Sequence, residues 1–155
     1  MKRLICAIIL VSLLCGCSKT GSQFNLNINS LSTAFHAKID GSEFEGYMAF
    51  DKNLNMILTM TYPDIIKGFS MTFCDDSVIS AVDNVDDSHK ADEFPKNFAF
   101  MSIYKALKTA AVSGGFIKNS DAAYELVCEG VTITADTGGN LTSASLKNGF
   151  FIFGL

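Results

Sequence analysis

The stretch Leu54-Asn55-Met56-Ile57-Leu58-Thr59-Met60-Thr61-Tyr62 decides the fold class of this chain. Every second residue in it is apolar, and three of the four residues between them are Asn or Thr. A period of two residues is that of a β-strand with one face buried and the other in water. We therefore start from a half-buried strand and follow the same period outward in both directions.

The two-residue period recurs on both sides of this stretch. Short polar segments separate the repeats, such as Asp40-Gly41, Asp51–Asn53 and Asp75-Asp76, which are typical of tight turns. Pro63 to Gly68 also interrupts the pattern. The N-terminal half is therefore predicted to be an antiparallel meander with strands at 35–39, 44–50, 54–62, 69–73 and 78–82.

The pattern changes after Val82. Residues 83–95 are polar and acidic and are predicted to form a loop. From 97 to 112 the apolar residues follow helical spacing, which predicts one buried helical stripe that consists of Phe100, Ile103, Tyr104, Leu107, Ala110 and Ala111. Gly114-Gly115 is expected to end that helix.

Strand patterns return after Asp121. They predict strands at 124–128, 131–135, 141–146 and 150–153, with Glu129-Gly130 and Asn148-Gly149 as hairpin turns. The order is a β-meander, one helix and a second β-meander. The expected fold class is thus α+β with a mostly antiparallel sheet.

The N-terminus has the features of an export signal. Met1-Lys2-Arg3 is positively charged, and residues 4–14 form an apolar run too short to span a bilayer. The run ends in Leu14, Cys15, Gly16 and Cys17, which resembles the lipobox of bacterial lipoproteins. The resemblance implies that residues 1–16 are removed and that the Cys17 thiol carries a diacylglycerol. An ordinary signal peptide without lipid is the alternative.

The segment that follows Cys17 is small and polar. Residues 17–32 are predicted to be the lipidated N-terminus and a flexible tether. The alternation of Phe24, Leu26 and Ile28 also fits a loosely held edge strand, and both interpretations remain open. Residues 33–155 are then a single domain, because about 139 mature residues suffice for one core but not for two.

The mature composition limits the binding partners. Removal of residues 1–16 leaves ten basic and sixteen acidic residues, a net charge of −6, and no arginine, because Arg3 is the only one in the chain. Nucleic-acid and phosphate sites favour basic patches and arginine forks, so these ligands are not expected. Attraction to anionic lipid is not expected either, and the membrane partner is reached through the lipid on Cys17.

Two phrases resemble the LolA/LolB-like superfamily of lipoprotein carriers. The first is Tyr62-Pro63-Asp64-Ile65-Ile66-Lys67-Gly68 between two strands, and the second is the strand and Asp-x-x-Gly turn in residues 129–141. The resemblance implies a curved, unclosed half-barrel sheet with a helix in its mouth and an apolar concave face that accepts acyl chains. This chain departs from the soluble carrier because it is anchored itself and lacks the arginine that holds the carrier's lid.

The concave face is the candidate ligand site. Its predicted lining consists of apolar residues at strand spacing, in which methionine supplies an adaptable surface: Phe44, Met48, Phe50, Met56, Leu58, Met60, Phe69, Met71 and Phe73. A plain core filled by the helix is the commoner role for such residues. Both interpretations stay open, as does a core at one end with a groove at the other.

No motif for catalysis or metal binding is present in the sequence. There is no Gly-x-Ser-x-Gly elbow, and neither His36 nor His89 has a second His or Cys at metal-binding spacing. No cofactor and no enzymatic activity are expected. Strand parity places Cys74 and Cys128 on opposite faces, so a disulfide between them is disfavoured.

Two functions remain from different classes. The first is an extracytoplasmic lipoprotein that binds an acyl chain or another apolar ligand. The second is a structural or protein-interaction lipoprotein with a filled core. In either case the anchor is expected in the cell membrane, or in the outer membrane if the cell has two.

Overall fold

The computed structural model describes residues 23–24, 28, 31–83, 85–113, 115–120 and 123–154. The predicted signal peptide, Cys17 and most of the predicted tether lie outside the described residues. Within them the dominant element is one large antiparallel sheet, accompanied by the helix α2 (Ala99–Ser113) and two short 3-10 helices, η2 (Asp64–Ile66) and η3 (Ala91–Glu93).

The sheet contains twelve described strands in the order β1-β8-β9-β10-β11-β12-β2-β3-β4-β5-β6-β7. The strands are β1 (Gln23–Phe24), β2 (Ser32–Ile39), β3 (Ser42–Phe50), β4 (Met56–Tyr62), β5 (Ser70–Phe73), β6 (Ser77–Val82), β7 (Val85–Lys90), β8 (Phe116–Ser120), β9 (Ala123–Cys128), β10 (Val131–Asp136), β11 (Leu141–Leu146) and β12 (Gly149–Phe153).

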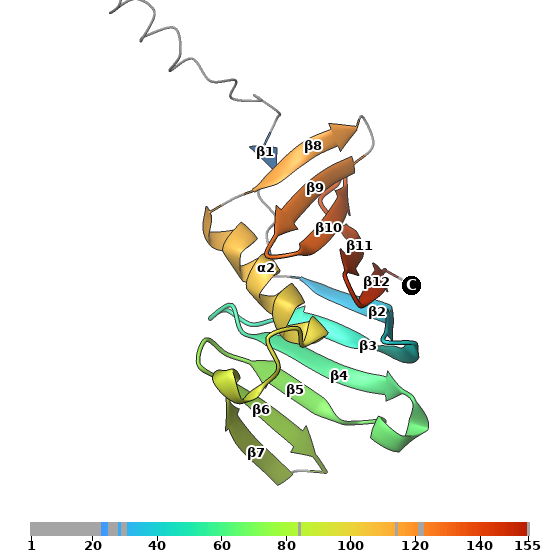
Figure 1. Ribbon diagram of the computed structural model, residues 1–155, viewed down its shortest axis with the longest axis vertical. Helices are drawn as coiled ribbons and strands as arrows, with labels where there is room; N and C mark the ends of the chain where they lie inside the picture. The colour runs from blue at the N-terminus through green and yellow to red at the C-terminus, as the bar shows by residue number, and fades with distance from the viewer. Residues whose placement is uncertain are drawn as a thin grey trace, which may run out of the picture.

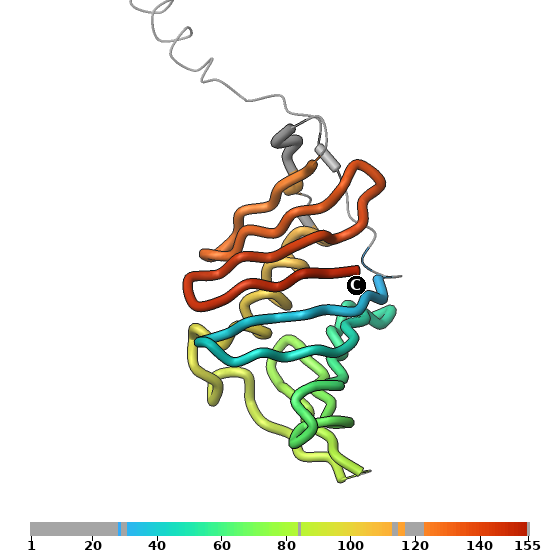
Figure 2. The backbone as a smooth tube through the Cα atoms, turned by 90° about the vertical axis from the view of Figure 1, so that its right-hand side faces the viewer, coloured from blue at the N-terminus to red at the C-terminus, as the bar shows by residue number. Residues whose placement is uncertain are grey.

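The two meanders are joined by the strand nearest the C-terminus. β12 pairs with β2, so that Phe151 lies opposite Ala37 and Phe153 opposite Phe35. The sheet remains unclosed, because β1 and β7 form its two separate ends. Figures 1 and 2 show the resulting long, curved sheet, with α2 lying across one face between the two meanders. The predicted α+β half-barrel with one main helix is thereby confirmed.

Helix α2 buries the stripe that its spacing predicts. Ile103, Tyr104 and Leu107 are almost fully buried, and Phe100 packs edge-on against Phe35 of β2 with ring centroids 6.1 Å apart. Burial of a large apolar side chain stabilises a fold by about 1.5–3 kcal/mol. The helix therefore holds the two halves of the sheet together through one continuous core.

Two strands lie where none was expected. Residues 83–95 were predicted to form a loop, but Val85–Lys90 forms β7, which pairs along its length with β6. Its residues are exposed or half-buried, so its sequence shows no alternation of apolar and polar residues. The backbone pairing with β6, not side-chain burial, holds it in the sheet. Phe116–Ser120 forms β8, which begins before the predicted return of strands at residue 121.

Two turn predictions need correction. Leu54 was placed in a strand, whereas β4 starts at Met56 and Leu54 has a φ of 62° in the turn before it. Asn148-Gly149 was predicted as the hairpin turn, but Leu146 pairs with Gly149, so Lys147 and Asn148 form the connection. A Cβ at Gly149 would lie 2.4 Å from the Lys38 carbonyl oxygen, so contact with β2 requires this glycine.

The stretch before β2 contacts the domain. Gln23–Phe24 pairs with Phe116 and Ile117 of β8, and Ile28 is only 2% exposed within the core. These contacts fall inside the predicted tether at 17–32. They correspond to the alternative interpretation of that stretch, a short edge strand.

Two hairpin loops have the same pattern of hydrogen bonds between an aspartate and an asparagine. In the loop 51–55, the amide nitrogen of Asn55 donates to Asp51 Oδ1 and its Nδ2 donates to Oδ2, both at 2.9 Å. In the loop 136–140, Asn140 makes the same two bonds to Asp136, also at 2.9 Å. The fourth loop position has a positive φ in each case, 62° at Leu54 and 86° at Gly139. The spacing Asp-x-x-x-Asn thus closes one hairpin in each meander.

Both aspartates should make stability depend on pH. Hydrogen bonds from Asn55 and Asn140 lower the pKa of Asp51 and of Asp136 below the ordinary value of 3.8. A carboxyl with a lowered pKa stabilises the fold above its unfolded-state pKa, and this contribution is lost as pH falls through the folded-state pKa. The melting temperature of the D51N/D136N variant should therefore fall less steeply than that of wild type below pH 4. Parallel melting curves against pH would contradict this account.

Candidate functional site

The predicted ligand-binding face lies mostly inside the core. Seven of its nine residues are buried beneath α2 and its flanking segments: Met48, Phe50, Met56, Leu58, Met60, Met71 and Phe73. Phe44 and Phe69 are partly buried and pack against the same cluster. The strand alternation therefore predicted which side chains face inward, and these side chains share one core with α2.

A pocket of about 430 Å³ opens at the N-terminal end of α2. We call it the aromatic pocket, and its lining consists of Ile39, Asp40, Ser42, Phe44, Pro95, Asn97, Phe98, Ala99, Phe100 and Asn148. Phe44 and Phe100 meet edge-on there, with ring centroids 6.2 Å apart. Phe100 in turn contacts Phe151 of β12 at 5.4 Å. One chain of ring contacts thus leads from the pocket into the core.

Polar groups form part of the rim of the aromatic pocket. Asn148 Nδ2 donates to Asp40 Oδ2 at 3.0 Å, and the amide of Asp40 donates to the carbonyl oxygen of Asn148 at 2.8 Å. These bonds join the β2–β3 turn to the β11–β12 turn. An apolar interior with a few fixed polar groups is the usual composition of small-molecule pockets.

Of the ten residues that line this pocket, only Phe44 was assigned to the ligand face from the sequence. Phe98 lies one residue before α2 and stacks on Phe94 with ring centroids 5.3 Å apart, and it also contacts Phe73 at 6.2 Å. Both Phe94 and Phe98 were assigned to no buried face. Their four-residue spacing, which continues the helical period backward from α2, is the signal that could have revealed them.

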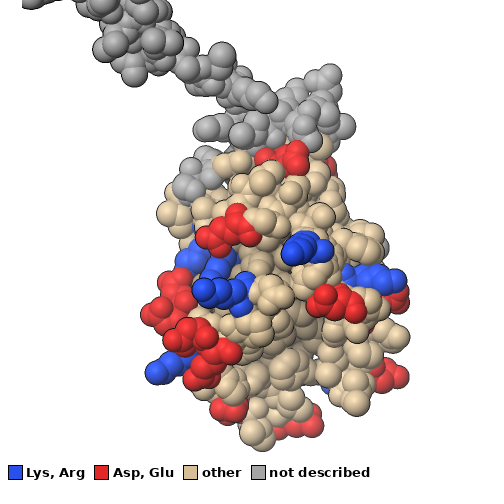
Figure 3. All heavy atoms as spheres, viewed as in Figure 1, with Lys and Arg blue, Asp and Glu red and all other residues tan. Residues whose placement is uncertain are grey.

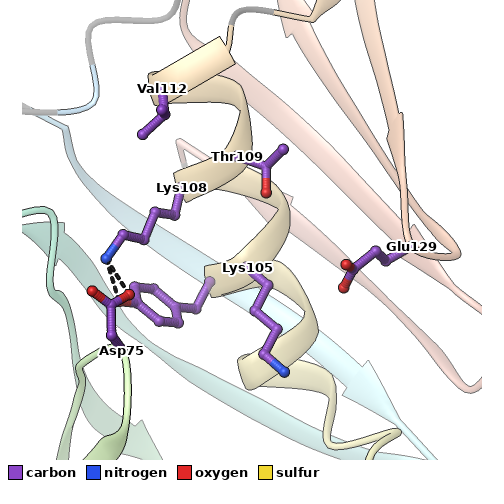
Figure 4. A pocket seen from close by; sticks show the side chains of 7 residues that line it. Asp75, Lys105, Lys108, Thr109, Val112 and Glu129 are labelled. Carbon is purple, nitrogen blue, oxygen red and sulfur yellow. Dashed lines mark hydrogen bonds and ion pairs between the residues drawn. The ribbon is translucent and has the colours of Figure 1, made fainter.

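A second pocket, also of about 430 Å³, lies along the C-terminal half of α2 (Figure 4). We call it the charged pocket, and its lining consists of Asp75, Tyr104, Lys105, Lys108, Thr109, Val112 and Glu129. Lys108 Nζ donates to Asp75 Oδ1 and, at 3.2 Å, to the hydroxyl oxygen of Tyr104. Figure 4 shows Glu129 approaching from the β9–β10 turn on the other side of the helix.

The charges of this second pocket are largely neutralised within it. The hydrogen bond to Asp75 raises the pKa of Lys108, and burial raises the pKa of Tyr104. Both shifts favour the protonated form of the group. The Asp75 side chain is 72% exposed, and pairs of that kind contribute at most about 1 kcal/mol. The ion pair is a weak link between α2 and the β5–β6 turn.

The remaining candidate residues do not assemble into a site. His36 Nδ1 lies 3.3 Å from Glu45, and His89 lies between Asp87 at 3.2 Å and Glu93 at 3.8 Å. Over the part of the chain that the structure describes, no group of three potential ligands could hold a metal ion. Cys74 and Cys128 are both free thiols.

Charge does not gather on the face that Figure 3 shows, where acidic and basic side chains are interspersed. Among the described residues, no helix has both the length and the hydropathy needed to cross a membrane. The lipobox residues Leu14, Cys15, Gly16 and Cys17 lie outside the described part, so lipidation stays a prediction.

Comparison with known proteins identifies no family from sequence. No family model matches the chain, and no curated protein matches it. Among solved structures, it is similar to a LolA superfamily protein from Nitrosomonas europaea, with 10% sequence identity and a TM-score of 0.36. The match covers 77% of this chain and 64% of that structure, so the chain spans less than two thirds of that protein's length. At this TM-score the likeness carries no argument about function, and the fold described above rests on the topology of the chain itself.

Proposed function

We propose that this chain is an exported, lipid-anchored and non-enzymatic lipoprotein whose domain binds an acyl chain or another apolar ligand. The aromatic pocket is the observation that carries the proposal. Its volume falls in the range of small-molecule sites, and Phe44 and Phe100 connect it to the core. An acyl chain would enter beside the N-terminal end of α2 and extend toward the rings beneath it.

A photoactivatable fatty acid tests this proposal. The expected label lies in peptides that contain Phe44 or Phe98, because both line the aromatic pocket. Phe44→Gln should reduce the labelling about tenfold or more, because it places an amide where the apolar chain would pack. Phe150→Gln is the matched control, since Phe150 is 41% exposed and outside the pocket, and it should leave the labelling unchanged.

The filled core favours a second candidate, a structural or interaction lipoprotein without a ligand. Seven of the nine predicted lining residues are already buried in the core cluster that also contains α2, so a ligand has little room on that face unless the helix moves. The same photolabelling separates the two functions. Labelling that is absent, or equally spread over the surface in wild type and F44Q, would favour the second.

The anchor has its own test. Cys17→Ser should move the protein from the membrane fraction to the soluble fraction of cells, because the mature chain is acidic and has no other hold that its sequence reveals. Cys15→Ser is the matched control and should remain anchored, because the lipobox position before Gly16 accepts serine. A C17S variant that stays wholly membrane-bound after residues 1–16 have been removed would refute the role of the anchor.

A further inference from the structure

The edge strand β7 (Val85–Lys90) has no described neighbour on its outer side. It is the last strand in the sheet order and pairs only with β6 among the strands that the structure describes. Five of its six residues are exposed and His89 is half-buried. Figure 1 places β7 at the opposite end of the sheet from β1.

The hairpin geometry determines which backbone groups β7 presents outward. Only two residues connect Val82 to Val85, which lie opposite each other, and the closing pair of a two-residue hairpin is hydrogen-bonded. Val85, Asp87 and His89 therefore bond to β6. The amide of Ala91 donates to the carbonyl oxygen of Asp76 at 2.9 Å, which fits the same alternation. It follows that Asp86, Ser88 and Lys90 direct their N–H and C=O groups to the free edge.

The charges of β7 are arranged in mirror order about Ser88. Two acids, Asp86 and Asp87, precede it, and two basic side chains, His89 and Lys90, follow it. His89 pairs with the fully buried Val78, so Asp87 and His89 share the concave face. Asp86, Ser88 and Lys90 share the convex face, because successive strand residues alternate.

We propose that a second copy of this chain pairs antiparallel with β7 across a two-fold axis at Ser88. In that register Asp86 lies opposite Lys90 of the second copy, and Asp87 lies opposite His89 of the second copy. The outward N–H and C=O groups of Asp86, Ser88 and Lys90 all find partners. Edge strands commonly carry charges to prevent pairing, but here the charges are complementary to a second copy of the same strand.

Neighbouring registers lack this complementarity. A two-fold axis requires residues on the same face to lie opposite each other, so the next registers are centred on Asp87 or on His89. The register centred on Asp87 places two aspartates directly opposite, and like charges in that position destabilise strand pairs. The register centred on His89 places Lys90 opposite Ser88, so both Asp86–Lys90 pairs are lost. The pairing would extend the sheet and leave α2 with both of its pockets uncovered. Confinement of anchored copies to one membrane would raise their effective concentration.

Cysteine crosslinking of the full-length protein in its own membrane tests the register. In Ser88→Cys, the two Cα atoms would lie about 5.5 Å apart across the axis, within the range of a disulfide. In Asp86→Cys they would lie about 14 Å apart. Mild oxidation should give a covalent dimer with S88C and none above wild type with D86C. No dimer with folded, exported S88C, or equal dimer with both, would overturn the proposal.

Charge exchange tests the ion pairs independently in the S88C protein. Asp86→Lys and Lys90→Asp each replace two attractive cross-strand pairs by two repulsive ones, which should lower the crosslinked fraction about tenfold. The double variant D86K/K90D restores both attractive pairs and should recover crosslinking. A double variant no better than either single variant would show that Asp86 does not face Lys90 of the second copy.

Discussion

Phe35→Ala is expected to lower the free energy of unfolding by about 4 kcal/mol. Phe35 is 2% exposed and lies on β2, where the two meanders meet. Its ring contacts Phe100 of α2 at 6.1 Å and Phe151 of β12 at 6.0 Å. Alanine would leave a cavity where β2, β12 and α2 meet. Because single domains are stable by only about 5–15 kcal/mol, this loss would leave the protein marginal.

Chemical denaturation followed by circular dichroism measures the Phe35 effect. Phe150→Ala on the neighbouring strand β12 is the control, because Phe150 is exposed on the other face and should cost less than about 1 kcal/mol. Equal losses from the two substitutions would mean that the core is not centred on the junction between β2 and β12.

Gly46→Ala should cost about 3 kcal/mol through steric overlap. A Cβ at Gly46 would lie 2.2 Å from the backbone oxygen of Thr59 and 3.0 Å from Cε1 of Phe35. The nearest contact is a backbone atom in a paired strand, so it cannot move aside without breaking the ladder. The register between β3 and β4 also shifts at Glu45 and Gly46, which marks a β-bulge. Bulges bend a strand and increase the local twist, so this glycine supports the curvature of the sheet.

A comparison of the melting temperatures of Gly46→Ala and Gly138→Ala tests whether the loss of stability comes from the steric overlap at Gly46. A Cβ at Gly138 would meet only the side-chain atoms of Asp136 at 3.2 Å and Asn140 at 3.4 Å. These side chains are exposed, so the control should lose much less stability. If G46A melts at the wild-type temperature, the close approach at Gly46 must tolerate a side chain, and the bulge that leaves Thr61 of β4 unpaired must not depend on this glycine.

The strands with one solvent-facing side and one buried side were predictable from the sequence. In β4, Met56, Leu58 and Met60 are buried while the residues between them are half-buried, and the two-residue period records that difference directly. The helical stripe of α2 was predictable for the same reason. β7 was not, because an edge strand with both faces in water places no demand on the apolarity of its residues.

The candidate site was predictable only in part. Phe44 was identified and does line the aromatic pocket, but Phe98 and Phe100 complete it from a segment more than fifty residues away. The position at which α2 packs on the sheet determines which of the apolar concave residues remain accessible. No local pattern contains that information, because the helix reaches the sheet through long-range packing.

The sequence by itself determined the order of elements, the inward face of most strands, the buried stripe of the helix and the prediction that Cys17 carries the anchor. Each of these depends on residue type at a fixed local spacing. Only the tertiary structure decided that β12 joins β2, that α2 fills most of the concave face, and that β7 forms a self-complementary free edge. Those features arise because segments far apart in the sequence pair with and bury one another. The surroundings of each side chain then depend on residues that no local pattern contains.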